Sequence, residues 1–392
     1  DIITASAGTS NFRAGVNAGN TIESGGNYNV VVGDEAGTAI TTGDNNVAVG
    51  YAALDATTTA NGNIAVGSNS LGVNITGASN VGVGHEALAA NTSGGENVAL
   101  GYGALDANTT ASSNTGVGYL ALSANITGTN NVGVGAASLD ANTTGDNNTG
   151  LGTNALSANT TAEANVAVGV NALILNTTGA YNVAIGAFAG DSITTSSGNV
   201  AIGMAALDGN TTAANNTAVG YNSLSAANTG GDNVAVGSNA MAANTSGYNN
   251  VAIGKNALAS NLGGDRNIAI GRYAMDVSTS AKYNIGIGND ALGSLTTADS
   301  NVAIGTNAFA AVTDGHSNTG VGDNAGAAVS SGDNNTFLGF QSGIAGSPGG
   351  AVTSGDNQIC LGDENVTHAH IQVDWTIASD QRDKTDFTAL DL

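Results

Sequence analysis

The chain has 392 residues, of which 59 are glycine, one is proline and one, Cys360, is cysteine. Thirty acidic and seven basic residues give a formal net charge of −23, which disfavours contact with nucleic acid and anionic membranes. One cysteine excludes an intrachain disulfide and a thiolate zinc cluster, and no apolar run reaches the roughly 18 residues of a membrane span. The chain starts at Asp1 without a methionine, so we expect a processed protein or a fragment of a longer one.

Residues 1–28 are an irregular lead-in to a regular repeat. Within them, residues 11–15 read Asn-Phe-Arg-Ala-Gly. Asn11 precedes Asn29, the first Asn of the regular copies, by one position more than the repeat period. We expect this segment to form a degenerate first turn.

Residues 29–345 carry the repeat itself. The pattern Asn-Val-Ala-Val-Gly returns with a 17-residue period, with its glycine at Gly33, Gly50 and onward to Gly339, which makes 19 copies. We number the repeat positions from this Asn, which is position one. Position two is β-branched and position four aliphatic, while position three is Ala or Gly except at Val31 and Phe337. Position eight is Ala or Ser, and position nine is Leu, Met or Phe in most copies and Gly in four.

A 17-residue unit cannot bury a core alone, whereas stacked copies bury a continuous one. We therefore predict an all-β fold, a parallel β-solenoid of some 20 turns and, at about 4.8 Å per turn, roughly 95 Å of length. Alternation places positions two and four on one face, which we predict to be the core, and position three on the other face. A second short strand at positions eight to ten would add the Leu. A helical solenoid is disfavoured by the Gly and β-branched residues, and an unfolded chain by the fixed aliphatic positions.

The small residues of position three or position eight would then form a flat outer face of Ala and Gly. Three such faces can approach closely around one axis, so we expect a parallel homotrimer.

The pattern breaks after Gly339. Residues 346–362 hold the only proline, Pro348, and we interpret them as a loop and a last turn that ends at Gly362. Residues 363–378 contain the only tryptophan, Trp375, in an alternating run typical of one or more closing strands. Residues 379–392 form a separate C-terminal segment.

The repeat resembles the head repeat of YadA-like trimeric autotransporter adhesins and is similar to the same repeat in bacteriophage tail fibres. The copies at 182–186, 199–203 and 301–305 read Asn-Val-Ala-Ile-Gly and carry the resemblance, which extends over about residues 29–362. It implies a left-handed parallel β-roll with three rolls around one axis. The 17-residue period departs from the shorter unit usual in the adhesins.

A second resemblance lies at residues 379–384, Ser-Asp-Gln-Arg-Asp-Lys. Ser-Asp-x-Arg-x-Lys looks like the opening of the endosialidase-type intramolecular chaperone domain of phage tailspikes and fibres, which trimerises the chain and then cuts itself off. The resemblance implies that Ser379 is the nucleophile of self-cleavage and Lys384 its base. Asp383 stands where that family usually has an apolar residue, and since 14 residues remain from Ser379 to Leu392, we expect the body of the domain to be absent from this sequence.

His368 and His370 are the candidate metal ligands. One residue separates them in an extended segment, so both rings would point to the same side. Around a threefold axis, six imidazoles would make an octahedral cage suited to a transition metal such as iron. The arrangement resembles His-x-His sites at the tips of phage fibres and spikes. The alternative is two solvated histidines on the outer face, and no other cofactor is expected.

Other polar patterns in the repeat have structural explanations. We interpret the Asn ladder as internal hydrogen bonding, and the isolated His85 and His316 as solvated loop residues. The Thr-Thr rows suggest turns more than an ice-binding face. The Gly-Asp-Asn turns lack the paired Asp ladder of calcium-binding repeats, which favours turn chemistry at Asp44, Asp146, Asp232, Asp333 and Asp356.

The sequence as a whole favours a structural and adhesive protein, the distal shaft of a phage tail fibre that attaches the virion tail to a host surface. Its expected partners are itself, other tail proteins, and a host surface glycan or outer-membrane protein. One alternative is the head of a bacterial trimeric autotransporter adhesin, located on the cell surface. Another is a polysaccharide-depolymerising tailspike, although 4% aromatic residues offer few platforms for sugars. Apart from self-cleavage, we expect no enzymatic activity.

Overall fold

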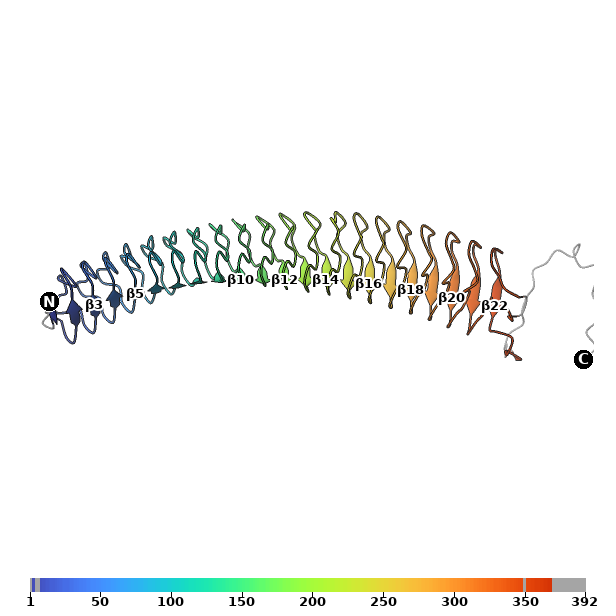
Figure 1. The fold of residues 1–392 in the computed structure, drawn as a ribbon, viewed down its shortest axis with the longest axis horizontal. Helices are drawn as coiled ribbons and strands as arrows, with labels where there is room; N and C mark the ends of the chain where they lie inside the picture. Colours follow the sequence, from blue (N-terminus) through green and yellow to red (C-terminus); the bar gives the residue numbers. More distant parts are fainter. Residues whose placement is uncertain (1, 4–7, 348–349, 369–392) are drawn as a thin grey trace, which may run out of the picture.

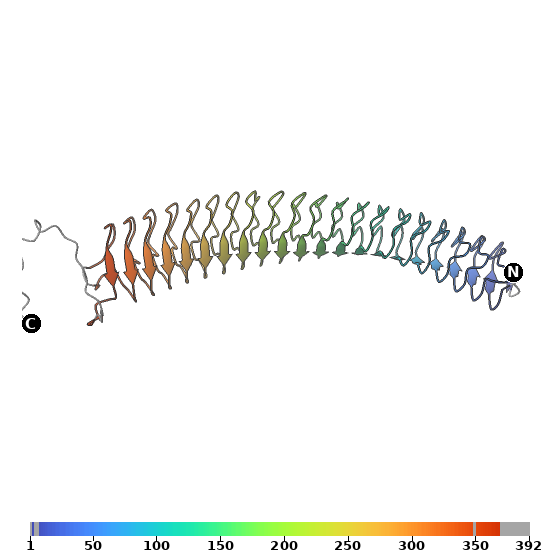
Figure 2. The same cartoon turned by 180° about the vertical axis from the view of Figure 1, so that it is seen from behind.

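The protein is a long rod made of one stack of turns. The structure, a computed structural model, describes residues 2–3, 8–347 and 350–368. Each turn contributes one short strand, and the strands lie side by side along the concave side of a gently bent column (Figure 1). The same arrangement is seen from behind in Figure 2. The all-β solenoid predicted from the repeat is thus confirmed, and no helix long and apolar enough to cross a membrane occurs among the described residues.

The strands follow the repeat, with one three-residue strand in each regular turn. They are β1 (Ile2–Ile3), β2 (Phe12–Ala14), β3 (Val30–Val32), β4 (Val47–Val49), β5 (Ile64–Val66), β6 (Val81–Val83), β7 (Val98–Leu100), β8 (Thr115–Val117), β9 (Val132–Val134), β10 (Thr149–Leu151), β11 (Val166–Val168), β12 (Val183–Ile185), β13 (Val200–Ile202), β14 (Thr217–Val219), β15 (Val234–Val236), β16 (Val251–Ile253), β17 (Ile268–Ile270), β18 (Ile285–Ile287), β19 (Val302–Ile304), β20 (Thr319–Val321), β21 (Thr336–Leu338) and β22 (Ile359–Leu361).

Each strand from β2 to β21 pairs in parallel with the next one along the chain. The register never slips: Val166 lies opposite Val183 and Ala167 opposite Ala184, for example. β2 pairs with β3 in spite of the extra residue between them, and β22 pairs with β21 across the longer loop, with Ile359 opposite Thr336. β1 differs, since it runs antiparallel to β2.

The core lies on the other face of the strand from the one predicted. Position three is fully buried, as at Ala167 and Ala184, whereas positions two and four are partly or largely exposed, as at Val183 and Ile185. The Leu of position nine occupies the interior, so only a small residue fits beside it. A Cβ on Gly116, for instance, would lie 3.2 Å from Cγ of Leu105 in the preceding turn. The predictions of buried positions two and four, and of an exposed Ala and Gly face, are therefore wrong.

Positions eight to ten form a turn and not the second strand that we predicted. The Leu of position nine is buried as expected, but its backbone is left-handed, with φ of 55° at Leu122 and Leu139. Position seven is left-handed as well, as at Leu120 and Ala137. Two such residues in one turn bend the chain sharply enough to return it under the strand, and this geometry is incompatible with extended pairing.

The glycine of position five is required by both backbone conformation and space. At Gly152, φ is +138°, a region that residues with a side chain rarely adopt. A Cβ there would lie 2.5 Å from the carbonyl oxygen of Gly169, one turn further on. The constancy of this glycine in all 19 copies follows from the stacking of one turn directly on the next.

The Asn of position one forms a continuous internal ladder. Each Asn Oδ1 accepts the backbone N–H of its counterpart in the following turn, as Asn131 does from Asn148 at 2.9 Å. The Nδ2 of the same side chain donates to the carbonyl of position fifteen, Gly145 in this turn, at 2.7 Å. Both groups are buried, and the ladder satisfies polar backbone that the solenoid removes from water. The structural interpretation of the Asn ladder is confirmed.

A second Asn ladder runs at position twelve through the consecutive turns from Asn74 to Asn176. Asn159 Nδ2 donates to Asn142 Oδ1 at 2.8 Å, for example. The ladder stops at Asn176 because the next turn has Ile193 at this position, and Asn176 Oδ1 is buried without a hydrogen-bond partner.

Larger residues elsewhere compensate for the glycines at position nine. Beside Gly190, Ile193 fills the space that Leu occupies in other turns, and a Cβ on this glycine would lie 3.0 Å from Ile193 Cδ1. Phe337 at position three likewise packs against Gly343, whose added Cβ would lie 2.1 Å from the ring. Positions three, nine and twelve therefore share one internal volume per turn.

Candidate functional site

The outer surface of the strands is an apolar stripe along the rod, which we call the strand face. It consists of the side chains at positions two and four, two rows that contain no charged residue in any of the 19 copies. Ile185, Ile253 and Ile304 are 38–40% exposed. These side chains are partly or largely exposed at every turn, so the apolar surface continues along the rod.

A cluster of basic residues interrupts an otherwise acidic rod. Of the five basic residues in the described chain, all but Arg13 lie between 255 and 282, on two consecutive turns. The basic belt, as we call it, consists of these four residues and three tyrosines: Lys255, Arg266, Arg272, Lys282, Tyr248, Tyr273 and Tyr283. The turns from 250 to 283 contain four basic and two acidic residues, so the belt reverses the charge of the rod locally.

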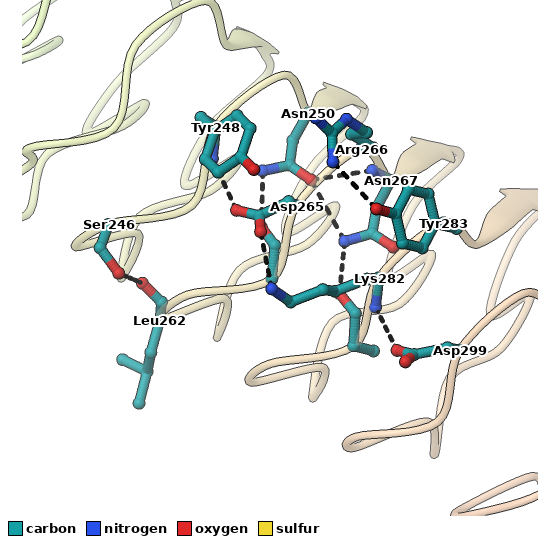
Figure 3. Close-up of polar contacts among 12 residues, drawn as sticks. Ser246, Tyr248, Asn250, Leu262, Asp265, Arg266, Asn267, Lys282, Tyr283 and Asp299 are labelled. Atoms are coloured by element: carbon teal, nitrogen blue, oxygen red, sulfur yellow. Dashed lines mark hydrogen bonds and ion pairs between the residues drawn. The ribbon is translucent and has the colours of Figure 1, made fainter.

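Arg266 occupies the centre of one edge of the basic belt (Figure 3). Its guanidinium lies 5.2 Å from the ring centroid of Tyr248 and 5.5 Å from that of Tyr283, one ring from each neighbouring turn. Its Nη1 donates to the Tyr283 hydroxyl at 2.9 Å. The described residues place no carboxylate within ion-pair distance of this guanidinium, since the ion pairs found among them are Lys282–Asp265 and His85–Glu86. Arg266 is exposed and held by two rings, so its charge is oriented but not neutralised.

Lys282 lies on the same edge and is anchored by a buried carboxylate. Its Nζ lies 2.9 Å from Asp265 Oδ2, and Asp265 Oδ1 accepts the backbone N–H of Tyr248 at 3.2 Å. The hydrogen bond to Asp265, with its charge, raises the pKa of the Lys282 ammonium. The side chain of Asp265 is 6% exposed and that of Lys282 is 43% exposed, so the ammonium is the part that meets solvent.

The second edge of the basic belt follows the strands. Arg272 comes directly after Gly271, the residue that follows β17, and its guanidinium lies 4.6 Å from the ring centroid of Tyr273. A hydrogen bond from Arg272, and then the charges of Arg272 and Lys255, lower the pKa of the Tyr273 hydroxyl. Lys255 is exposed at the same repeat position one turn earlier. The two edges therefore flank the strand face formed by β16 and β17.

The sequence contains a signal for the basic belt that the repeat pattern does not reveal. Four of the seven basic residues fall within 28 consecutive positions, and we missed this cluster because we followed periodicity. Tyr248 occupies repeat position sixteen, whereas Arg266 and Tyr283 occupy position seventeen. The solenoid nevertheless stacks these three side chains, and their proximity depends on the turn geometry.

A second aromatic column lies elsewhere on the rod. His85, Tyr102 and Tyr119 occupy position six of three consecutive turns, and their rings stack with centroids 5.2 and 5.6 Å apart. His85 is exposed, as is His316, whose Nδ1 accepts the backbone N–H of Asp299 at 2.9 Å. The prediction of exposed loop histidines is confirmed.

The aspartates of the Gly-Asp-Asn turns bind neighbouring turns. Asp146 accepts the backbone N–H of Thr129 at 2.6 Å, and Asp333 accepts that of His316 at 2.7 Å. The hydroxyl of Thr143, in a Thr-Thr pair, donates to a carbonyl of the next turn and so contributes to the stack. These contacts agree with the turn chemistry that we expected.

Most of the predicted site residues lie outside the described residues: Ser379, Lys384 and His370. His368 is described and exposed, with its Nδ1 2.9 Å from Thr367 Oγ1. Within residues 2–3, 8–347 and 350–368, no three His, Cys, Asp or Glu side chains are grouped so that they could hold a metal ion.

Comparison with known proteins adds no assignment. No family model matches the chain, and no curated protein matches it.

Proposed function

We propose that the protein is a structural and adhesive fibre component, the distal shaft of a bacteriophage tail fibre, and that it assembles as a parallel homotrimer. The observation that supports this function is the uninterrupted, charge-free strand face along a long rod. Depletion of charge is typical of the centre of a protein interface.

A second copy of the same chain is the partner that best fits the strand face. The two rows of side chains recur once per turn over 19 turns. A partner must match that spacing to stay in contact along the whole rod, and a parallel copy has the same spacing by construction. Burial of the partly exposed apolar side chains in every turn would stabilise the assembly by the hydrophobic effect.

Native mass measurement tests the trimer directly. Light scattering should give about three times the chain mass of 37.8 kDa. A monomeric mass under native conditions would contradict the proposal.

Cysteine cross-linking tests which face is used. In a Cys360→Ser background, Val168→Cys on the strand face should form interchain disulfides under mild oxidation, because equivalent side chains meet near the axis. Thr178→Cys, on the loop side, is the matched control and should remain unlinked. Equal cross-linking of both variants would mean that the strand face is not the interface.

The location can be tested with antibodies against residues 29–345. Electron microscopy of material from the organism that encodes the protein should show label on phage tails. Label confined to the bacterial surface would instead favour the adhesin head.

A further inference from the structure

We propose that the basic belt is a binding site for an anionic polysaccharide. This inference names a ligand class for the adhesive part of the proposed function. Only the biological role of the binding rests on that proposed function. The binding itself is a property of the named residues.

The first argument is charge. A polyanion is repelled by most of a rod whose net charge is −23 and is attracted where four cations gather on two turns. Three of these cations, Lys255, Arg266 and Arg272, have no carboxylate within ion-pair distance among the described residues. They are therefore free to pair with an external anion.

The second argument is the geometry around Arg266. Its planar guanidinium lies between two tyrosine rings, which restrict its motion before any ligand binds. A restrained guanidinium loses less conformational entropy when it binds a carboxylate, sulfate or phosphate group in bidentate fashion. Tyr248 and Tyr283 are 37% and 52% exposed and present apolar surface for sugar rings next to that charge.

The third argument is extent, which favours a polymer over a small anion. Arg266 precedes β17 and Arg272 follows it, and the three extended residues of β17 alone span about 10 Å. A single sulfate or sugar acid cannot bridge such a distance. In the proposed trimer the strand face between the two edges is buried, so a polysaccharide contacts edges of two neighbouring copies along the outer surface.

Nucleic acid is the competing polyanion, and the structure disfavours it. Asp276 lies on one of the same turns and Asp290 on the next one, and both are partly exposed, so a densely charged backbone would meet repulsion near the basic belt. A polysaccharide with one charge per sugar has more widely spaced charges and can avoid these carboxylates.

The test measures binding of the intact protein to polygalacturonate and alginate, which carry one charge per sugar, with dextran as the neutral control. Both anionic polymers should bind at low salt, and binding should weaken as the salt concentration rises. Arg266→Gln and Arg272→Gln should each lower the affinity about tenfold, as expected for loss of a charge-assisted hydrogen bond. Tyr283→Phe should retain most binding, and Tyr283→Ala should lose a part of it.

The matched control is Thr153→Asp. It makes the same change in net charge at an exposed position six, far from the basic belt. Its affinity should stay within about twofold of wild type, because a distant exposed charge is screened. Circular dichroism and native mass, measured on every variant, separate loss of the site from loss of the fold or of the trimer.

Three results would overturn the inference. One is that neither anionic polymer binds the wild-type protein at low salt. Another is that Arg266→Gln and Thr153→Asp have equal effects. The third is that single-stranded or duplex DNA binds as tightly as polygalacturonate. Each can occur with the trimer intact, so failure of this inference is distinguishable from failure of the proposed function.

Discussion

The position-five glycine shows how a single residue type limits the fold. Replacement of Gly152 by alanine should destabilise the protein by at least about 1–3 kcal/mol from the backbone conformation alone, with the contact to Gly169 O in addition. Chemical denaturation would measure this. Gly72→Ala is the control, because its added Cβ would lie 3.4 Å from the nearest atom, an ordinary contact. Equal losses in the two variants would refute the role assigned to position five.

The aspartates at position ten should make stability depend on pH. Burial raises the pKa of Asp140 and Asp208, and the charge of Asp191 raises that of Asp208 further. Oδ1 of each of Asp140 and Asp208 is buried without a hydrogen-bond partner. Since the folded-state pKa exceeds the unfolded value near 3.9, the folded state binds more protons between these two values. The contribution of these groups to stability therefore increases as the pH falls through that window.

Asp208→Ser tests this dependence, because serine occupies the same position at Ser225 in the next turn. The variant should be more stable than wild type at pH 7, and the difference should shrink as the pH falls towards about 4. Denaturation curves across this pH range are the measurement. A difference that grows on acidification would show that the sign is wrong.

Within one turn, the side chains at positions three, nine and twelve share one internal volume. The double change Gly190→Leu with Ile193→Asn gives this turn the residues found in its neighbours. It should restore a donor for Asn176 Oδ1, which has no partner in the native protein. Each single change should be destabilising, because Gly190→Leu overfills the space beside Ile193 and Ile193→Asn empties it.

The measurement for that pair is a double-mutant cycle. The double variant should be more stable than the sum of the single effects predicts, by roughly 0.5–3 kcal/mol for residues in contact. Additive effects would mean that positions nine and twelve do not share a volume.

The strands lie where the repeat predicted them, but we assigned the wrong face of each strand to the core. Alternation shows that positions two and four share a face, but it does not show whether that face is inside. We assigned the larger side chains to the core, whereas Leu at position nine already fills it. The two large residues at position three indicate that this position faces the core. Val31 and Phe337 occur in turns in which position nine is a glycine, Gly37 and Gly343.

The basic belt was less accessible to sequence reasoning. The local concentration of charge is visible in the sequence, but the position of Arg266 between Tyr248 and Tyr283 depends on turns in which position seventeen is left-handed. Irregular turn geometry of this kind does not follow from residue periodicity.

For the whole molecule, the fixed register makes length adjustable by whole turns. Deletion of residues 132–148 removes one complete repeat and should leave Asn131 followed by Thr149 in phase. Such a variant should keep its circular dichroism spectrum and shorten the rod by about 4.8 Å. Deletion of 132–139 alone breaks both ladders and should lower the unfolding temperature. Small-angle scattering and thermal unfolding check the two outcomes.

The Asn ladders also give the rod a direction. In both of them, Oδ1 accepts from the turn that follows, at Asn29 from Asn46 as at Asn142 from Asn159, except at Asn176, where the second ladder stops. The side-chain amides therefore point head to tail along the axis, and their dipoles add up as peptide dipoles do in a helix. This all-β rod consequently has an axial polarity in its interior, with donors turned towards the N-terminal end and acceptors towards the C-terminal end. Two rods placed side by side are electrostatically different in parallel and in antiparallel orientation, although their surfaces look alike from turn to turn.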